Sequence, residues 1–215
     1  MDIQERLNAF AMLGAGWVMW LLVGLSIIGL AIVLERAYYL FASHDDIPKL
    51  RKDLRALLRT DGVEAARKRL DESRSFEASI VRAGLEVAEE GPESVEERIA
   101  GETAIAKQQM ERNLVFLGTV GNNAPFVGLL GTVIGIIRAF HALDESAGQV
   151  TSGLMTEVGE ALVATAIGIL VALPAVAFFN VFQRIVRGRL GWADALGRDL
   201  MAHLKARPAQ PKAAE

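Results

Sequence analysis

The sequence contains no cysteine, which excludes disulfide bonds and thiolate metal sites. Its histidines, His44, His141 and His203, lack the spacing of metal ligands. The glycine-rich stretches have neither the lysine nor the preceding strand of a phosphate-binding loop, and no nucleophile motif is present. The net charge of −3 indicates no general affinity for nucleic acid. We therefore expect a protein that is not an enzyme and has no metal site or cofactor.

Charged residues are absent from residues 17–34 and 114–137, and Glu160 is the only one in residues 158–182. The chain is nevertheless 23% charged and 52% hydrophobic, so charge and apolarity are segregated along it. Each apolar stretch is long enough to cross a hydrocarbon core of about 30 Å as a helix. The first is too long for a signal peptide and lacks a cleavage pattern. The predicted fold class is an all-α membrane protein with three transmembrane helices.

Lysine and arginine are distributed unevenly between these stretches. Residues 49–112 contain 13 of them and residues 184–212 contain seven, whereas residues 141–157 contain none and the leader contains only Arg6. Basic residues accumulate on the cytoplasmic side of a membrane. We therefore expect the N-terminus and the second connection outside the cytoplasm, and the long middle segment and the C-terminus inside it.

This topology divides the chain into eight expected segments. They are a periplasmic N-terminal segment (1–16), a first transmembrane helix (17–41), a cytoplasmic helical domain (42–113), a second transmembrane helix (114–140), a periplasmic connection (141–157), a third transmembrane helix (158–183), a cytoplasmic helical extension (184–205) and a disordered tail (206–215).

The middle segment predicts helices throughout, because no alternating pattern is long enough for a strand. Residues 45–48 open a first helix and residues 60–62 end it. Two shorter helices are expected at about 63–70 and 76–89, and Gly91-Pro92 then breaks the pattern.

Ser94 and Glu97 have the spacing of a capping box, which predicts the start of a long helix. Its apolar stripe continues into the second transmembrane stretch without a helix breaker, so that helix is expected to extend into the cytoplasm. Apolar residues after Phe182 extend the third helix in the same way: Ile185, Trp192, Leu196, Leu200 and Leu204. Such stripes are more often packing surfaces than ligand sites, and here they favour helix association.

Small residues recur along the second and third transmembrane stretches and let helix backbones approach closely. The expected packing residues are Gly128, Gly131, Gly135, Ala161, Ala164 and Gly168. Pro125 and Pro174 predict helix kinks, because proline has no N–H for the helix ladder. The carbonyl groups that they free could also accept a bond from water or bind an ion.

Glu160 permits two interpretations on spacing alone. A carboxylate at membrane depth is disfavoured by roughly 2.5 to 3.5 kcal/mol, so it usually faces protein or water and has a function there. A span of about 20 residues could instead begin at Val163 and leave Glu160 in the headgroup region, near a helix N-terminus. The glycine and alanine faces favour a Glu160 that packs against protein rather than lipid.

Other polar residues in the transmembrane stretches have simpler explanations. The hydroxyl groups of Thr132 and Thr165 are expected to bond back to the carbonyl groups of Gly128 and Ala161 in their own helices. Arg138 ends the second stretch, where its long side chain could reach the membrane surface.

Two motifs, NNAPFVGLLGTVIGIIRAF and GEALVATAIGILVALPAVAFFNVFQR, closely resemble the TolQ/ExbB proteins and, more distantly, flagellar stator proteins of the MotA type. The resemblance is specific over residues 122–184 and agrees in character with most of the remainder. It implies a proton-channel subunit of the bacterial inner membrane, in which the family's functional carboxylate falls on Glu160 and its polar lumen threonines fall on Thr132 and Thr165.

The resemblance further implies a homo-oligomeric ring, pentameric in the family, around the single transmembrane helices of an ExbD/TolR-like partner with an essential Asp. Such a motor uses the proton motive force for transport, envelope maintenance or motility. Burial raises the pKa of a carboxyl group, so Glu160 could alternate between protonation states. The alternatives are a non-conducting membrane scaffold that anchors a periplasmic machine and a channel that needs no partner.

Overall fold

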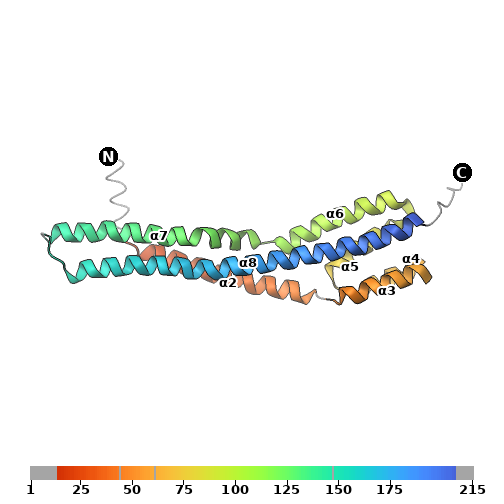
Figure 1. Ribbon diagram of the computed structural model, residues 1–215, viewed down its shortest axis with the longest axis horizontal. Coiled ribbons are helices and arrows are strands. Elements are labelled where there is room, and N and C mark those ends of the chain that lie inside the picture. Colours follow the sequence, from red (N-terminus) through yellow and green to blue (C-terminus); the bar gives the residue numbers. More distant parts are fainter. Residues whose placement is uncertain (1–13, 44, 61, 147, 207–215) are drawn as a thin grey trace. The chain divides into compact units, whose positions relative to one another are not determined.

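The computed structural model describes residues 14–43, 45–60, 62–146 and 148–206. Regular structure in these ranges is helical: α2 (Gly16–Ala42), α3 (Ile47–Thr60), α4 (Gly62–Asp71), α5 (Phe76–Glu86), a 3₁₀ turn (Ala88–Glu90), α6 (Pro92–Glu111), α7 (Leu114–Glu145) and α8 (Ser152–Ala206), as Figure 1 shows. Helices α2, α7 and α8 include the segments that are long and apolar enough to cross a membrane. The predicted fold class, an all-α protein with three such helices, is confirmed. The leader before residue 14 and the tail after residue 206 lie outside the described residues.

The chain forms two compact units. The membrane unit combines the described part of Met1–Glu35 with Asn113–Val181, and the helical unit combines Arg36–Arg112 with the described part of Phe182–Glu215. Helices α2 and α8 therefore contribute residues to both units.

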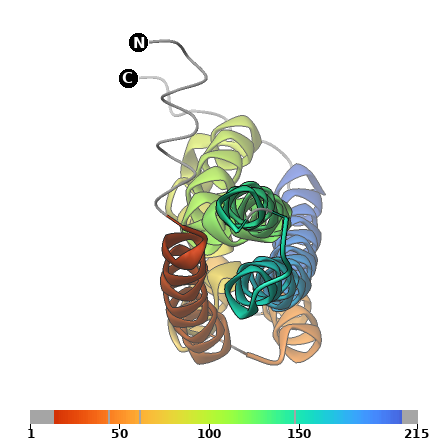
Figure 2. The same ribbon diagram turned by 90° about the vertical axis from the view of Figure 1, so that its left-hand side faces the viewer.

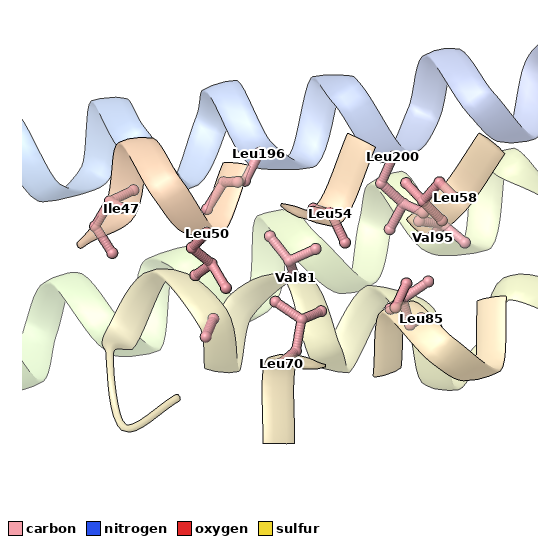
Figure 3. Close-up of a cluster of buried hydrophobic side chains, with 12 residues drawn as sticks. Ile47, Leu50, Leu54, Leu58, Leu70, Val81, Leu85, Val95, Leu196 and Leu200 are labelled. Carbon is pink, nitrogen blue, oxygen red and sulfur yellow. The ribbon is translucent and has the colours of Figure 1, made fainter. Parts of the chain in front are cut away.

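The helical unit has a core built from the stripes that the sequence predicted. Leu50 and Leu54 of α3 recur four residues apart and point to the same side, as do Leu196 and Leu200 of α8 (Figure 3). Side chains of α4, α5 and α6 complete the cluster, which includes Leu70, Val81, Leu85 and Val95. Full burial of one such side chain stabilises the fold by about 1.5 to 3 kcal/mol. The apolar stripe on this part of α8 is thus explained by packing within the chain.

A buried ion pair lies beside this core. Arg189 of α8 places Nε 3.3 Å from Oε1 of Glu77, and only 8% and 1% of these two residues are exposed. The same guanidinium donates to the hydroxyl group of Ser43 at 2.7 Å and to the carbonyl oxygen of Ser43, and it covers the ring of Phe76. Because breaking a buried pair leaves an uncompensated charge, it costs about 3 to 5 kcal/mol. This cluster therefore joins α8 to α5 and to the end of α2.

The long helix expected to continue into the second transmembrane stretch is broken. Arg112 is extended (φ −51°, ψ 135°) and Asn113 is left-handed (φ 63°, ψ −7°), so α6 and α7 are separate helices. Asparagine tolerates this conformation better than most residues with a side chain. Nη1 of Arg36 donates to the carbonyl oxygen of Gln109 at 2.9 Å, which satisfies a carbonyl group of the last turn of α6. The prediction of an unbroken helix was wrong because neither glycine nor proline marks the break.

Two other helix limits differ from the sequence prediction. Helix α6 begins at Pro92 after Gly91, with no side-chain cap, so the capping box expected at Ser94 is not formed. Proline suits this first position, since it lacks the N–H that would have no partner there. In addition, α7 runs to Glu145 and α8 begins at Ser152, so the helices extend well into the expected outer connection of residues 141–157.

The three helices of the membrane unit lie side by side, as Figure 2 shows with α2 in red-brown, α7 in green and α8 in teal. All three helices contribute side chains to one hydrophobic core: Val18 and Leu22 of α2, Val120, Ala124 and Ile134 of α7, and Val171, Ala172 and Ala175 of α8. Large apolar side chains such as Ile27, Phe126 and Leu170 are exposed on the outside of the unit. The unit thus combines a core of mostly small and branched residues with an apolar surface suited to lipid or to other chains.

Candidate proton pathway in the membrane unit

The backbones of α7 and α8 are in direct contact at positions where a glycine of one helix faces the other helix. A Cβ atom placed on Gly128 would lie 2.7 Å from the carbonyl oxygen of Ala164, and one on Gly168 would lie 2.7 Å from the carbonyl oxygen of Ala124. Both distances are too short for a methyl group, and the neighbouring atoms belong to a helix backbone that cannot easily move away. Only glycine therefore permits the observed approach at these two positions.

The contact continues toward the connection between the two helices. A Cβ atom on Gly131 would lie 2.6 Å from Cβ of Ala164, and one on Gly135 would lie 2.5 Å from Cβ of Ala161. The six packing residues named from the sequence thus lie in one α7–α8 contact. Close contact of small residues is the main source of packing energy between helices in lipid.

Thr165 makes a hydrogen bond between the helices rather than within its own. Its Oγ1 donates to the carbonyl oxygen of Gly128 on α7 at 3.1 Å. The prediction of a bond to Ala161 was wrong, because the missing side chain of Gly128 brings its carbonyl group within reach. Thr132 donates to the carbonyl oxygen of Leu129 at 2.6 Å, not to that of Gly128 as predicted. The two threonines therefore donate to neighbouring carbonyl groups in the same turn of α7, Thr132 from α7 itself and Thr165 from α8.

Pro125 and Pro174 lie inside α7 and α8. Each removes one N–H from its helix ladder and frees the carbonyl group four residues earlier, at Gly121 and Leu170. Gly121 lies in the helix contact, where an added Cβ atom would be 2.5 Å from Cγ2 of Val176. That helix kinks occur at these prolines stays a prediction.

Glu160 is exposed on α8, although its neighbour Ala161 is only 1% exposed. Consecutive residues of a helix point about 100° apart, so the face that packs on α7 includes Ala161 and leaves Glu160 outside. The expectation that Glu160 packs against protein is therefore not met within the described residues of one chain.

An ion pair that the sequence did not predict joins the last turns of α7 to the first turns of α8. Nη2 of Arg138 lies 2.8 Å from Oε1 of Glu157, and 32% and 19% of these two side chains are exposed. Arg138 was expected to extend toward the membrane surface, and Glu157 was assigned to the outer connection. The longer α8 instead places Glu157 in its second turn, opposite α7. The sequence does contain a signal for this pair, because Arg138 and Glu157 are opposite charges on either side of the short connection between α7 and α8.

The model of the MotA/TolQ/ExbB proton channel family matches residues 72–191, which are more than half of the chain. The chain belongs to this family. The matched residues include all of α7 and the part of α8 that contacts it, and therefore Thr132, Glu160 and Thr165. They also include Arg138 and Glu157, both members of the ion pair between these helices.

Curated members of the family match part of the chain. The chain is 39% identical over 98 residues to the biopolymer transport protein ExbB of Aquifex aeolicus, covering 45% of this chain and 66% of that protein. It is 39% identical over 96 residues to the Tol-Pal system protein TolQ of Pseudomonas aeruginosa, covering 43% and 42%. An ExbB-like biopolymer transport protein of Helicobacter pylori is 43% identical over 75 residues, covering 35% and 50%. The matched residues thus span between 42% and 66% of the length of these relatives.

Proposed function

We propose that the chain is a proton-channel subunit of a bacterial inner-membrane motor, which couples the proton motive force to work in the envelope. The observation that carries the proposal is the exposure of Glu160 on α8, next to the close α7–α8 contact. It is the only ionisable residue in residues 158–182. A carboxylate at this depth is costly unless protein or water surrounds it. Its exposure among the described residues supports a site that other chains complete.

The chains that complete the site would be of two kinds. We propose a ring of copies of this chain, pentameric as the family resemblance implies, around an ExbD/TolR-like partner with one transmembrane helix and an essential Asp. The exposed apolar side chains of α2, α7 and α8 supply surface for contacts between copies. The uneven distribution of lysine and arginine supports a periplasmic N-terminus and a cytoplasmic C-terminus.

In this mechanism Glu160 is a relay or a gate, and the Asp of the partner carries the proton. Thr132 and Thr165 would line the same pathway, where hydroxyl groups can both donate and accept hydrogen bonds. The Thr165 bond to Gly128 supports this proposal, because it holds the Thr165 hydroxyl group beside α7. Moving one charge through 100 mV releases about 2.3 kcal/mol, which is enough to bias a cycle of conformations. Glu160 would gain a proton in one step of this cycle and lose it in a later step.

The names of the relatives indicate two candidate processes. The Aquifex relative is named for biopolymer transport and the Pseudomonas relative for the Tol-Pal system. We propose energised transport or envelope maintenance as the work that is done, with motility as a third use known in the wider family. A receptor, lipoprotein or motility gene beside the gene of this chain would identify which of the three applies.

Replacement of Glu160 tests the proposal in cells. We expect E160Q to abolish the process that depends on the proton motive force, while the complex still assembles and the partner still copurifies with it. E145Q is the matched control, because Glu145 is an exposed carboxylate at the end of α7, outside the apolar stretch. It should behave as wild type. Normal activity of E160Q would refute the motor and support a non-conducting scaffold.

A further inference from the structure

The ion pair of Arg138 and Glu157 lies within one helical turn of Glu160. Glu157 and Glu160 are three residues apart on α8, and residues at this spacing on a helix are neighbours, with Cβ atoms about 5–6 Å apart. Glu157 is paired with Arg138, whereas no described residue pairs with Glu160. The two carboxylates therefore differ in their environment despite their proximity.

Arg138 is held on a second side as well. A Cβ atom on Gly14 would collide with Nη1 of Arg138, so the guanidinium lies directly against the backbone that precedes α2. Gly14 has φ 84°, a conformation that favours glycine. The second oxygen of Glu157, Oε2, is buried and has no hydrogen-bond partner among the described residues. A charge at Glu157 consequently depends on Arg138 for its compensation.

We infer that Arg138 is a positioning residue that neutralises Glu157 and thereby lets Glu160 exchange its proton as an independent site. This inference rests on the proposed function and specifies how its proton site is tuned. Two carboxylates one turn apart disfavour each other's ionisation, so without Arg138 they would share protons as a coupled pair. With Arg138 present, the positive and negative charges nearly cancel at Glu160, and each carboxylate keeps a separate role.

The remaining charges at this end of the unit are few. On α7 they are His141, Asp144 and Glu145, all of them exposed at the end of the helix. The described part of α2 in this unit has no charged residue before Glu35, at the opposite end of that helix. On α8, no other charged residue occurs before Arg184. Arg138 and Glu157 are thus the charges nearest to Glu160 along the described α7 and α8.

Carboxyl labelling measures this compensation without requiring motor activity. A hydrophobic carbodiimide reacts with protonated carboxyl groups, and mass spectrometry reports the labelled fraction of Glu160 at each pH. The full-length oligomer in nanodiscs would be compared with R138Q, E157Q and R138Q/E157Q. We expect the pH of half-labelling to rise by about one to two units in R138Q, because Glu157 is then uncompensated, and to fall by a similar amount in E157Q. The double variant should return close to wild type.

Unchanged labelling in both single variants would overturn the inference, as would a double variant that fails to restore the wild-type midpoint. R138K keeps the charge and should keep the wild-type midpoint. If R138Q does not assemble, E157Q and R138K still test the inference, because each has its own predicted midpoint. The E160Q experiment tests the proposed function separately. Active E160Q with the predicted labelling shifts would refute the motor alone, and inactive E160Q with unshifted labelling would refute the role of Arg138 alone.

Discussion

At the scale of single residues, the hydroxyl group of Thr165 joins two helices that otherwise meet through small side chains. Its donor bond to the carbonyl oxygen of Gly128 crosses from α8 to α7. Gly128 accepts it because no side chain of its own shields its carbonyl group. The same residue thus permits the close approach and receives the polar bond. This is a physical reason for the pairing of these two residue types.

Replacement of Thr165 by valine keeps the shape of the side chain and removes the bond. Side-chain hydrogen bonds between membrane helices contribute about 0.6 kcal/mol on average and up to about 1.7. We therefore expect T165V to lower the unfolding free energy in mixed micelles by about 0.5 to 1.5 kcal/mol. T156V is the control, since Thr156 bonds to the carbonyl oxygen of Ser152 within α8. Equal losses in the two variants would contradict a contribution specific to the helix contact.

The sequence predicted part of this site. Glu160 stands out because it is the only ionisable residue of its apolar stretch, and the glycine and alanine spacing indicates close packing. The partners of Thr165 and Arg138 depend on the register between two helices, which one sequence does not reveal. The exposure of Glu160 also depends on which face of α8 meets α7. The sequence therefore indicated which residues matter at this site, but it could not predict which residue of one helix contacts which residue of the other.

At the scale of helices, glycine determines how closely α7 and α8 can approach. The carbonyl oxygen of Ala124 occupies the place of a side chain at Gly168. By contrast, an added Cβ atom on Gly159, earlier in the same helix, would have no neighbour within 4 Å. The two glycines therefore allow a matched comparison of packing and helix propensity.

We expect G168A to destabilise the chain by about 1 to 3 kcal/mol, because the added methyl group forces a backbone shift in a packed contact. G159A should be neutral or stabilising by up to about 1 kcal/mol, since alanine is the better helix former. Thermal unfolding of both purified variants measures the difference. A G168A variant as stable as G159A would show that the helices do not depend on this approach.

Helix limits followed the sequence where local signals are strong. Asp46 caps α3 by accepting a hydrogen bond from the backbone N–H of Lys49 at 3.0 Å, at the start predicted for that helix. The break at Arg112 and Asn113 has no such signal, and the carbonyl group that it exposes finds its donor in Arg36 on another helix. Tertiary contacts of this kind override a continuous apolar stripe.

At the scale of the molecule, the helical unit is held together by charge pairs as well as by its core. Asp199 of α8 binds Arg51 and Arg55 of α3, each at 2.6 Å. Burial by itself would raise the pKa of Asp199, but the hydrogen bonds from the two arginines outweigh it and hold the pKa below the usual 3.8. The pairs therefore stabilise the unit fully above the unfolded-state pKa and lose this contribution as the pH falls through the lower folded-state value.

We expect D199N to lower the stability of the helical unit at pH 7 by about 1 kcal/mol or less, given the partial exposure of both arginines. The difference from wild type should shrink as the pH falls below about 4. Trp192 fluorescence in a W17F/W20F background would report unfolding of this unit. D194N is the control, because the pair of Asp194 with Arg198 is largely exposed. A gap between wild type and D199N that persists at low pH would contradict the assigned role.

The all-α class and three membrane-length helices followed from the segregation of charge along the sequence. The division into two units did not, because α2 and α8 each contribute to both. The proposed ring and its partner depend on other chains and remain predictions. The exposure of Glu160 supports both proposals, the assembly with other chains and the proton-channel activity.

Proton flux into liposomes tests the central claim most directly. The full chain would be reconstituted with its single-span partner, and a pH-sensitive dye inside the vesicles would report flux under an imposed proton gradient and potential. We predict flux for wild type and for E145Q, at least a tenfold loss for E160Q, and little flux from this chain without the partner. Flux in E160Q equal to that of wild type would contradict the account.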